Sequence, residues 1–370
     1  MRSLREKLMA VPARPRPQKE AAGDCYMKEM RIPAAQFLLP DEIAGEGLSM
    51  MLGGCWQDVK KDRILFLDTE TTGLSHGAGT VAFLVGVGYF EENCFVVKQY
   101  LMRDYDEEPF LLQRVEEHLK EKDFLCTFNG ASFDMPLLEA RFTMQRMRPD
   151  LSHGHIDLLH VARRVWKMRL KSCRLSRLEE MVLGITREDD LPGALVPERY
   201  FAYLKTKDFA LLEDILEHNG QDIVSLAHLL HRLCVLHQCP LTAQSREDLF
   251  SLGKVYEKRG KTEGARQCYR AADGGNLSAL ARARIAETYR REGNTHEAAR
   301  EYRQMIACRQ GGTGPLIAMA KICEHKTKDI PQALEYTRRT IMFAAEREDG
   351  EMAALQKRFE RLMKKARKDG

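Results

Sequence analysis

The side chains best suited to chemistry are two carboxylates, Asp68 and Glu70, at the end of a short apolar segment. Residues 63–67 (Arg-Ile-Leu-Phe-Leu) have the length and composition of a buried strand. Because side chains at i and i+2 of a strand point to one face, we expect both acids to project together where the strand leaves the sheet. Two adjacent anions need a cation, and oxygen-preferring Mg²⁺ or Mn²⁺ is the natural candidate. An isolated Asp-x-Glu is more often an ordinary strand end, so other segments must supply further ligands.

Two later segments carry further acids at suitable positions. Asp134 follows a second predicted strand, within residues 123–130, and falls in the first turn of a predicted helix, where an anion is favoured. His218 and Asp222 are four residues apart in a helical pattern over 214–230, so they share a helix face. The ordinary alternatives are a helix cap for Asp134 and an exposed i, i+4 pair for His218 and Asp222. A metal site would give Asp222 the partner that a carboxylate near an apolar face needs.

Together, these segments resemble the motifs of the DEDD superfamily of 3′→5′ exonucleases, which have an RNase H-like fold. Asp68-Thr-Glu70 looks like the first motif. Asn129-Gly-Ala-Ser-Phe-Asp134 looks like the second, in the form seen in proofreading domains of B-family polymerases. His218-Asn-Gly-Gln-Asp222 takes the place of the third. The resemblance covers roughly residues 60–235, as the helix and strand patterns indicate.

Four further segments are similar to YprB-type bacterial RNase H-like proteins, namely residues 157–160, 173–179, 190–193 and 197–201. In proteins of that type, a nuclease-like domain is often followed by tetratricopeptide-type helices. These segments indicate kinship more than activity. Asp157 itself is predicted to cap a helix and not to bind metal.

The resemblance implies metal-dependent hydrolysis of phosphodiester bonds of DNA or RNA, starting from the 3′ end. It assigns Asp68, Glu70, Asp134 and Asp222 to two Mg²⁺ or Mn²⁺ ions, with Asp68 bridging them, and adds His218 as a catalytic residue. One ion would present a water as hydroxide, and the other would stabilise the charge on the leaving oxygen. The residues implied to bind the substrate are Thr71, Thr72, Leu74, Asn129 and Phe133, of which Phe133 could equally serve the core.

The third motif departs from both common forms of the family. One branch has Tyr four residues before the last Asp and the other has His five residues before it. Here His218 has the Tyr spacing and Glu217 stands five before Asp222. His218 can orient or deprotonate the attacking water, or can replace Tyr in a slow enzyme. The main alternative is therefore a catalytically weak nucleic-acid-binding or scaffold protein that retains the nuclease fold. A third reading is a structure-selective endonuclease.

The elements that must position these residues form an α/β fold, an RNase H-like mixed sheet flanked by helices. Further strands are expected at residues 81–90 and 94–102, and a helix at residues 107–121. The chain divides into a flexible basic and proline-rich arm (1–24), an N-terminal extension (25–58), the exonuclease domain (59–240) and an all-α, tetratricopeptide-like repeat domain (241–370).

The repeat is predicted from spaced small and large residues, with a unit of about 34 residues. The first copy contains Leu249, Leu252, Gly253, Tyr256, Ala265, Tyr269 and Ala272, and weaker copies contain Ala286, Tyr289, Ala298 and Tyr302, then Ala320, Ala333, Tyr336 and Thr340. A plain helical bundle is the alternative. Such arrays commonly present a concave surface, so a protein partner on the repeats is possible.

Composition agrees with a nucleic-acid enzyme without proving one. The net charge of +4 over 370 residues is mild, but one run is strongly basic. It comprises Arg163, Arg164, Lys167, Arg169, Lys171, Arg174 and Arg177. This run could steer a phosphate backbone towards the acids or could form a solvated helix face.

Localisation and metal content follow from what the sequence contains. No apolar segment is long enough to span a bilayer and no signal core is present, which predicts a cytoplasmic protein with no membrane partner. Ten cysteines then suggest reduced thiols. His228, His231 and Cys234 could reach one zinc ion, but they are more simply members of the helix that closes the nuclease domain.

Overall fold

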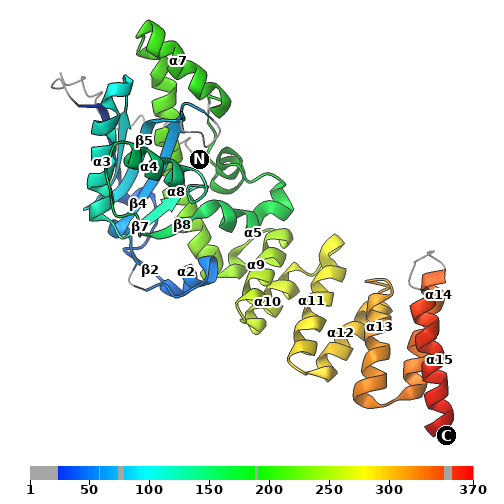
Figure 1. The fold of residues 1–370 in the computed structure, drawn as a ribbon. Coiled ribbons are helices and arrows are strands. Elements are labelled where there is room, and N and C mark those ends of the chain that lie inside the picture. The colour runs from blue at the N-terminus through cyan, green and yellow to red at the C-terminus, as the bar shows by residue number, and fades with distance from the viewer. Residues whose placement is uncertain (1–23, 58, 74–78, 188–190, 346–351, 370) are drawn as a thin grey trace. The chain divides into compact units, whose positions relative to one another are not determined.

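The computed structural model describes residues 24–57, 59–73, 79–187, 191–345 and 352–369. Backbone contacts divide the chain into two units, Met1–Gln238 and Cys239–Gly370 (Figure 1). Among the helices in these ranges, none combines the length and the apolar character that crossing a bilayer requires.

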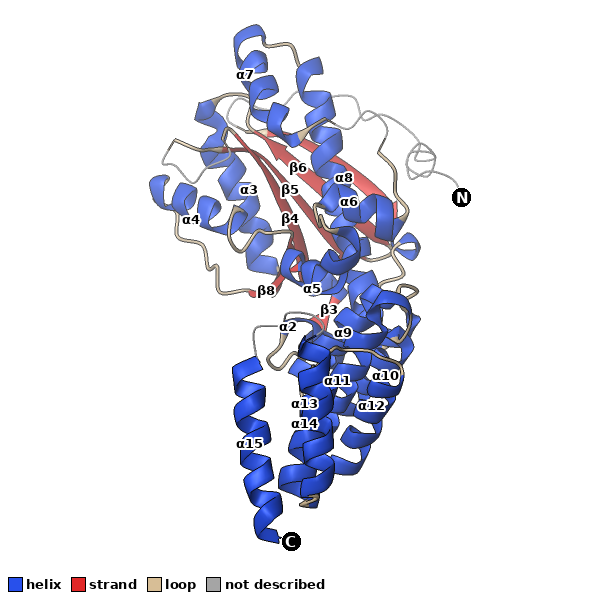
Figure 2. Cartoon of the chain, turned by 90° about the vertical axis from the view of Figure 1, so that its right-hand side faces the viewer, coloured by secondary structure: helices blue, strands red, loops and turns tan. Residues whose placement is uncertain are grey.

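A six-stranded mixed sheet forms the centre of the first unit, as predicted (Figure 2). Its order is β1-β6-β5-β4-β7-β8. β4 (Ile64–Thr71) pairs antiparallel with β5 (Ala82–Glu91), and β5 pairs antiparallel with β6 (Cys94–Leu101). β7 (Phe124–Thr127) and β8 (Gly154–Asp157) run parallel to β4. The predicted hairpin of residues 81–90 and 94–102 is confirmed as β5 and β6.

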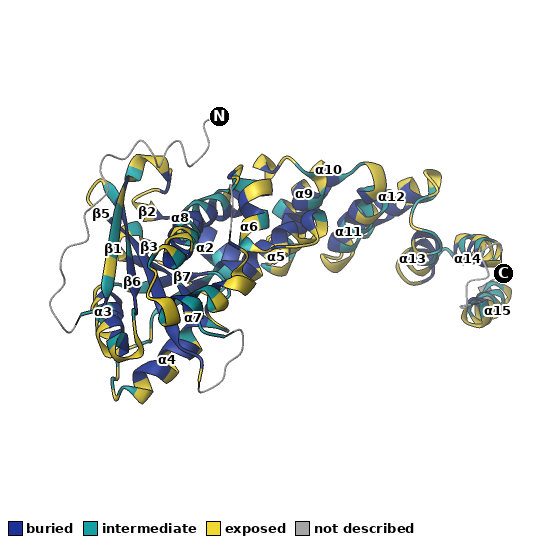
Figure 3. Cartoon of the chain, turned by 90° about the horizontal axis from the view of Figure 1, so that it is seen from above, coloured by how far each residue is buried: buried dark blue, intermediate teal, exposed yellow. Residues whose placement is uncertain are grey.

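The predicted N-terminal extension contributes a strand to this sheet. β1 (Tyr26–Pro33) pairs antiparallel with β6 along its whole length and forms one edge. Its side chains are mostly exposed or half-buried, unlike those of β5 (Figure 3). Residues after β1 form a separate two-stranded sheet of β2 (Glu42–Ile43) and β3 (Val59–Lys60), with α2 (Gly45–Leu52) between them.

Helices cover both faces of the main sheet, because its central strands are apolar on both sides. Leu65 and Leu67 of β4 belong to a core cluster that also contains side chains of α3 (Glu108–Glu121) and α4 (Asp134–Met144). Phe66 points to the opposite face, where its ring contacts Phe90 and Phe95. The long helix α8 (Ala210–Gln238) packs against β4, β5 and β6. The helix predicted at residues 107–121 is confirmed as α3.

Strand β4 extends further than the sequence suggested. It continues through Thr71, since Asp68 pairs with Gly86 and Glu70 with Leu84 on β5. The pairing becomes irregular only between Glu70 and Thr71. The two acids therefore lie in the last paired residues of β4 and not beyond the strand. Sheet hydrogen bonds fix their backbone.

Three α-helices lie among the described residues between β8 and α8. α5 (Leu158–Leu170) begins after Asp157, whose carboxylate accepts a hydrogen bond of 3.0 Å from the Leu159 amide, so the predicted helix cap is confirmed. α6 (Leu175–Leu178) leads into a single π-helical turn over Glu179–Leu183. α7 (Val196–Thr206) then packs on β4 and α8.

In its described residues, the second unit contains helices and no strand. Its helices are α9 (Arg246–Lys258), α10 (Thr262–Ala272), α11 (Ser278–Arg291), α12 (Thr295–Ala307), α13 (Gly314–Ile322), α14 (Ile330–Ala345) and α15 (Met352–Asp369). Each packs against the next. A Cβ at Gly253 of α9 would lie 2.6 Å from the Tyr269 ring of α10, so this pair of helices approaches closely. The all-helical fold is confirmed, and the tetratricopeptide assignment stays a prediction.

Candidate acid site on β4, α4 and α8

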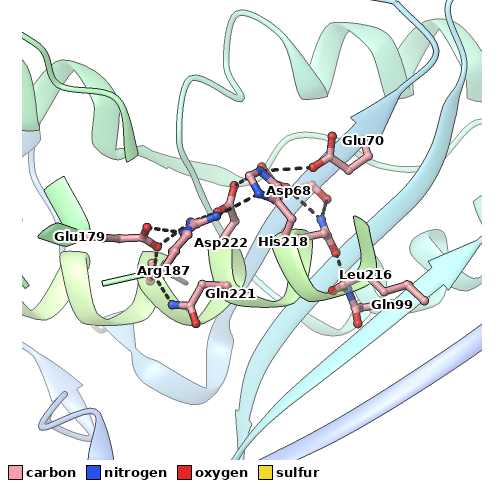
Figure 4. A network of polar contacts seen from close by, with 11 residues as sticks. Asp68, Glu70, Gln99, Glu179, Arg187, Leu216, His218, Gln221 and Asp222 are labelled. Carbon is pink, nitrogen blue, oxygen red and sulfur yellow. Dashed lines mark hydrogen bonds and ion pairs between the residues drawn. The ribbon is translucent and has the colours of Figure 1, made fainter. Parts of the chain in front are cut away.

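Asp68 and Glu70 share one face of β4, and α8 crosses that same face. The crossing is close because Gly86 and Gly88 of β5 have no side chains there. A Cβ at Gly86 would lie 2.2 Å from Oδ1 of Asn219 on α8, and one at Gly88 would lie 2.4 Å from Ile223 Cγ2. The polar residues of α8 are thereby brought against the acids of β4 (Figure 4).

Asn219 fixes the orientation of Asp68. Its Nδ2 donates to Asp68 Oδ2 at 2.9 Å and to the Asp68 carbonyl oxygen at 3.3 Å. Asn219 is itself completely buried, and its Oδ1 accepts a 3.0 Å hydrogen bond from Nε2 of Gln99 on β6. The same Gln99 nitrogen donates to the Leu216 carbonyl at 2.7 Å. A chain of amides thus runs from β6 through α8 to the carboxylate.

Asp134 is the first residue of α4, as the sequence predicted, and it is buried. Its Oδ1 accepts a 2.5 Å hydrogen bond from the Thr69 hydroxyl. Thr69 lies between Asp68 and Glu70 on β4, so its side chain points to the opposite face of the strand. Asp134 therefore reaches the end of β4 from the α4 side, while the other acids lie on the α8 side.

His218 stands between two carboxylates on the α8 side. Its Nε2 lies 3.8 Å from Glu70 Oε1 and 3.7 Å from Asp222 Oδ2. Its Nδ1 lies 3.1 Å from a guanidinium nitrogen of Arg187. The predicted i, i+4 pair with Asp222 thus faces the acids and not the solvent, since both side chains are about 15% exposed.

Arg187 is a member of the site that sequence reasoning missed. Its Nε and Nη2 donate to both carboxylate oxygens of Glu179, at 2.6 and 2.7 Å, and Nη2 also donates to Oδ1 of Asp222. The Glu179 side chain is fully buried and accepts a further hydrogen bond from the Ser225 hydroxyl of α8. Arg187 therefore joins the π-helical turn to α8 (Figure 4).

The other acids lack a full counter-charge, and their pKa values show it. Burial, followed by repulsion from Asp222, Asp134 and Glu70, raises the pKa of Asp68 well above its usual range. Burial raises the pKa of Glu70 to about 8, although His218 and Arg187 oppose the rise. Burial also raises the pKa of Asp134 to about 6, against the hydrogen bond from Thr69. The site is a cluster of acids that a further cation would favour in their ionised form.

The ligand atoms of the site are of the kind that hard divalent ions prefer, but their present positions do not form a binding site. Asp68, Glu70, Asp134 and Asp222 offer carboxylate oxygens, the ligands that Mg²⁺ and Mn²⁺ prefer. Within the described ranges, however, no three acidic, histidine or cysteine side chains converge closely enough to hold one ion as they stand. Two of the four acids are engaged elsewhere, Asp134 by Thr69 and Asp222 by Arg187.

Of the residues predicted to bind substrate, four lie in the described part of the chain. The Thr71 hydroxyl donates a 2.8 Å hydrogen bond to the Gly73 carbonyl, and the Thr72 hydroxyl accepts a 3.0 Å hydrogen bond from the Val81 backbone amide. Asn129 has a positive φ of 72°, and its amide donates to Asp157 at 3.0 Å. Phe133 is half-buried immediately before α4. Leu74 lies outside the described residues.

Sequence signals for the missed residues differ in strength. Asn219 could have been found, because it is three residues before Asp222 on the same helix and adjacent to His218. Gln99 interrupts an apolar strand, which marks a buried amide that needs a partner. Arg187 carries no periodic signal. His228, considered above as a zinc ligand, stacks on the Phe37 ring with the two ring centroids 4.5 Å apart. It is therefore a packing residue of α8.

Comparison with known proteins agrees with the fold. Residues 65–234, which contain all four acids, match the RNase_H superfamily. The Bacillus subtilis (strain 168) protein YprB is 32% identical over 331 residues, which cover 86% of this chain and 78% of YprB.

A solved structure also matches, at a lower level. It is that of the family B DNA polymerase from the hyperthermophilic archaeon Pyrobaculum calidifontis, with 18% identity and a TM-score of 0.40. The match covers 56% of this chain and 30% of the polymerase, so this chain spans less than a third of that protein. From the fold and the match to YprB, the chain belongs to the YprB family and contains an RNase H-like domain.

Proposed function

We propose that the protein is a metal-dependent 3′→5′ exonuclease that hydrolyses phosphodiester bonds of DNA or RNA. The observation that carries the proposal is the gathering of Asp68, Glu70, Asp134 and Asp222, with His218, at the end of β4. Bringing four acids from three separate segments together without enough positive charge to balance them destabilises a fold, so the cluster indicates a function. Membership of the RNase H superfamily supports a nucleic-acid hydrolase.

The chain's own residues have distinct tasks in this proposal. When bound, two divalent ions would supply an activated water and would stabilise the leaving 3′ oxygen. Asn219 holds Asp68 in one orientation for the ions. His218 can orient a water lying between Glu70 and Asp222 by donating its Nε2–H, because the Arg187 guanidinium donates to its Nδ1. Thr71, Thr72, Asn129 and Phe133 would line the path of the terminal nucleotide.

Exposed basic residues of the first unit would serve the phosphate backbone. Arg163, Lys167, Lys171 and Arg174 are exposed on or just after α5. Their charge would steer nucleic acid towards the first unit by long-range attraction, which salt weakens. The helical second unit would hold a protein partner or place the substrate.

A second candidate function is a nucleic-acid-binding or scaffold protein with little catalysis. The observation that favours it is the pairing of Asp222 with Arg187, which leaves one of the four acids already neutralised. The shifted histidine of the third motif points in the same direction.

An assay with end-labelled oligonucleotides separates the two. Single- and double-stranded DNA and RNA, labelled at the 5′ end, are incubated with protein and Mn²⁺ or with EDTA. We expect a ladder of products shortened from the 3′ end, with no products in EDTA. Asp68→Asn should lower the rate at least about 100-fold, because a lost metal ligand removes several kcal/mol of transition-state stabilisation.

The matched control is Asp214→Asn. Asp214 is an exposed carboxylate near the start of α8, where it pairs with Arg199, so its loss should leave the rate unchanged. Retained binding of oligonucleotides with no cleavage of any of them, in the wild-type protein, would replace the exonuclease by the scaffold function.

A further inference from the structure

The four acids of the site differ in how their charge is balanced. Asp68, Glu70 and Asp134 are held by hydrogen-bonding groups or by a histidine. Asp222 instead receives a hydrogen bond from a full cation, the guanidinium of Arg187. A guanidinium beside a carboxylate satisfies the same electrostatic demand as a metal ion.

Arg187 is anchored independently of Asp222. It is bound through two nitrogens to the fully buried Glu179, which is also held by Ser225 of α8. The bidentate contact uses Nε and Nη2, so Arg187 can release Asp222 and keep Glu179. Among the described residues, the single positive charge of Arg187 is shared by the carboxylates of Glu179 and Asp222, so these three groups together retain a negative charge that still attracts a cation.

The contact also divides Asp222 into two unlike oxygens. Oδ1 accepts from Arg187, whereas Oδ2 faces His218 Nε2 at 3.7 Å. On the β4 side, Asp68 and Glu70 contact no Arg or Lys side chain through a hydrogen bond or ion pair recorded within the described residues. A first cation is expected to bind beside these two acids, where the repulsion is least compensated.

We propose that Arg187 is the counter-cation of Asp222 in the free protein and competes there with a divalent ion, so that the site binds one ion tightly and a second weakly. The inference rests on the proposed function, because it presupposes divalent ions at these acids. Arg187 is a positioning residue in this scheme. Its displacement, driven by substrate phosphate together with the second ion, would tie assembly of the full site to the presence of nucleic acid.

Metal binding by the whole chain, without nucleic acid, tests this directly. Protein stripped with EDTA and dialysed is titrated with Mn²⁺, and the electron paramagnetic resonance signal of free aquo-Mn²⁺ counts the bound ions. We expect one tight ion for the wild type and a second ion bound at least about tenfold more weakly. Arg187→Gln should tighten the second ion by at least about tenfold, the lower range for a lost charge-assisted hydrogen bond.

Three further variants assign the effect to Asp222 and guard against misfolding. Arg187→Lys keeps the charge and should retain weak binding of the second ion. Arg187→Gln with Asp222→Asn should lose the gain. If Arg187→Gln does not fold, Glu179→Gln with Arg187→Met removes both charges, so no lone buried carboxylate remains, and it should show the same gain. Arg199→Gln, which breaks an exposed pair with Asp214, is the matched control.

The outcomes separate this inference from the function on which it rests. Two equally tight ions in the wild type, or no change in the second ion in either charge-removing variant, would overturn the role of Arg187 and leave the exonuclease proposal standing. No bound Mn²⁺ in any of the proteins, at millimolar concentrations, would overturn both.

Discussion

His118, a buried histidine on α3, couples the stability of the sheet to pH. Its Nε2 lies 2.8 Å from the Tyr100 hydroxyl of β6. Its Nδ1 is buried and has no hydrogen-bond partner among the described residues. Protonation would therefore bury a charged N–H with nothing to accept it. Burial, assisted by Lys98 and Lys122, lowers the pKa of His118 to about 4.

The expected consequence is a destabilising contribution of His118 in mild acid, opposite in sign to that of carboxyls with raised pKa values such as Glu70. The unfolded histidine has a pKa of about 6.5, so the unfolded state takes up the proton first as the pH falls. The contribution of His118 is complete above pH ~6.5 and declines by about 3 kcal/mol on the way to pH ~4. Urea unfolding followed by tryptophan fluorescence measures it, because both tryptophans, Trp56 and Trp166, lie in the first unit. His118→Phe should flatten that part of the profile, and equal slopes for the two proteins would contradict the assignment.

At this same scale, the sequence predicts residues whose signals are local. Asp68 and Glu70 were paired correctly by strand alternation, and His218 and Asp222 by helix spacing. Arg187 could not be predicted, because its partners Glu179 and Asp222 belong to other elements and meet it only in the folded chain. The engagement of Asp134 by Thr69 was missed for a related reason, since it depends on the direction from which α4 approaches β4.

Among the elements, the crossing of α8 over β5 determines the geometry of the acid site. Gly86 is paired with Asp68 in the sheet and faces Asn219. The absence of a Cβ allows α8 to approach so closely that Asn219 reaches the neighbouring strand. The close contact is a property of the pair of elements, and neither sequence segment shows it alone.

Gly86→Ala should therefore weaken both the fold and the site. The added Cβ would lie 2.2 Å from Asn219 Oδ1, so α8 or the amide must shift. We expect a loss of about 1–3 kcal/mol in the free energy of unfolding, as for overpacked cores, and weaker Mn²⁺ binding through the disturbed Asp68. Urea titration and the Mn²⁺ titration measure the two effects.

Gly193→Ala is the control for this change. A Cβ there would meet nothing within 4 Å, and its φ is not positive, so stability should change little. Unaltered stability and metal binding in Gly86→Ala would show that the crossing tolerates a methyl group and that Asn219 is not tied to it.

On the scale of the whole molecule, each unit has its own buried centre. In the second unit, Glu324 forms a buried polar centre in the π-helical turn Cys323–Thr327, which follows α13. Its fully buried carboxylate accepts hydrogen bonds from Arg358 at 2.8 Å, Arg361 at 2.9 Å and Lys365 at 2.7 Å, all on α15. This carboxylate joins α15 to α13.

Glu324→Gln should destabilise the second unit and leave the first unit unchanged. Removing one partner of a buried ion pair costs about 3 kcal/mol at the lower end of the usual range, which suits the half-exposed Arg361 and Lys365. Helical circular dichroism should lose part of its signal at lower urea, while the tryptophan transition stays in place. Glu335→Gln, in an exposed pair with Arg338, is the control. A tryptophan transition that moves equally would show that the two units unfold as one.

The sequence predicts the change of fold class along the chain, from a mixed sheet to an all-helical region. The strand patterns end before the helical region, and the small residues of the first repeat, Gly253, Ala265 and Ala272, are buried between helices. What the patterns could not reveal is that β1, within the predicted extension, completes the sheet. An edge strand with mixed burial has no regular alternation, so its pairing depends on β6 being available.

The length and burial of α8 predict slow hydrogen exchange at the acid site. The helix runs over 29 residues and buries side chains along all of its turns, and the acid-site residues are within it. Amide protons around Asn219 should therefore exchange with solvent only when the entire first unit unfolds, on a scale of hours or longer. Arg187 lies in neither a helix nor a strand, and its amide should exchange far sooner. The backbone amides of the two ion-pair residues, Arg187 and Asp222, would then exchange on different timescales, and Asp222 would exchange more slowly.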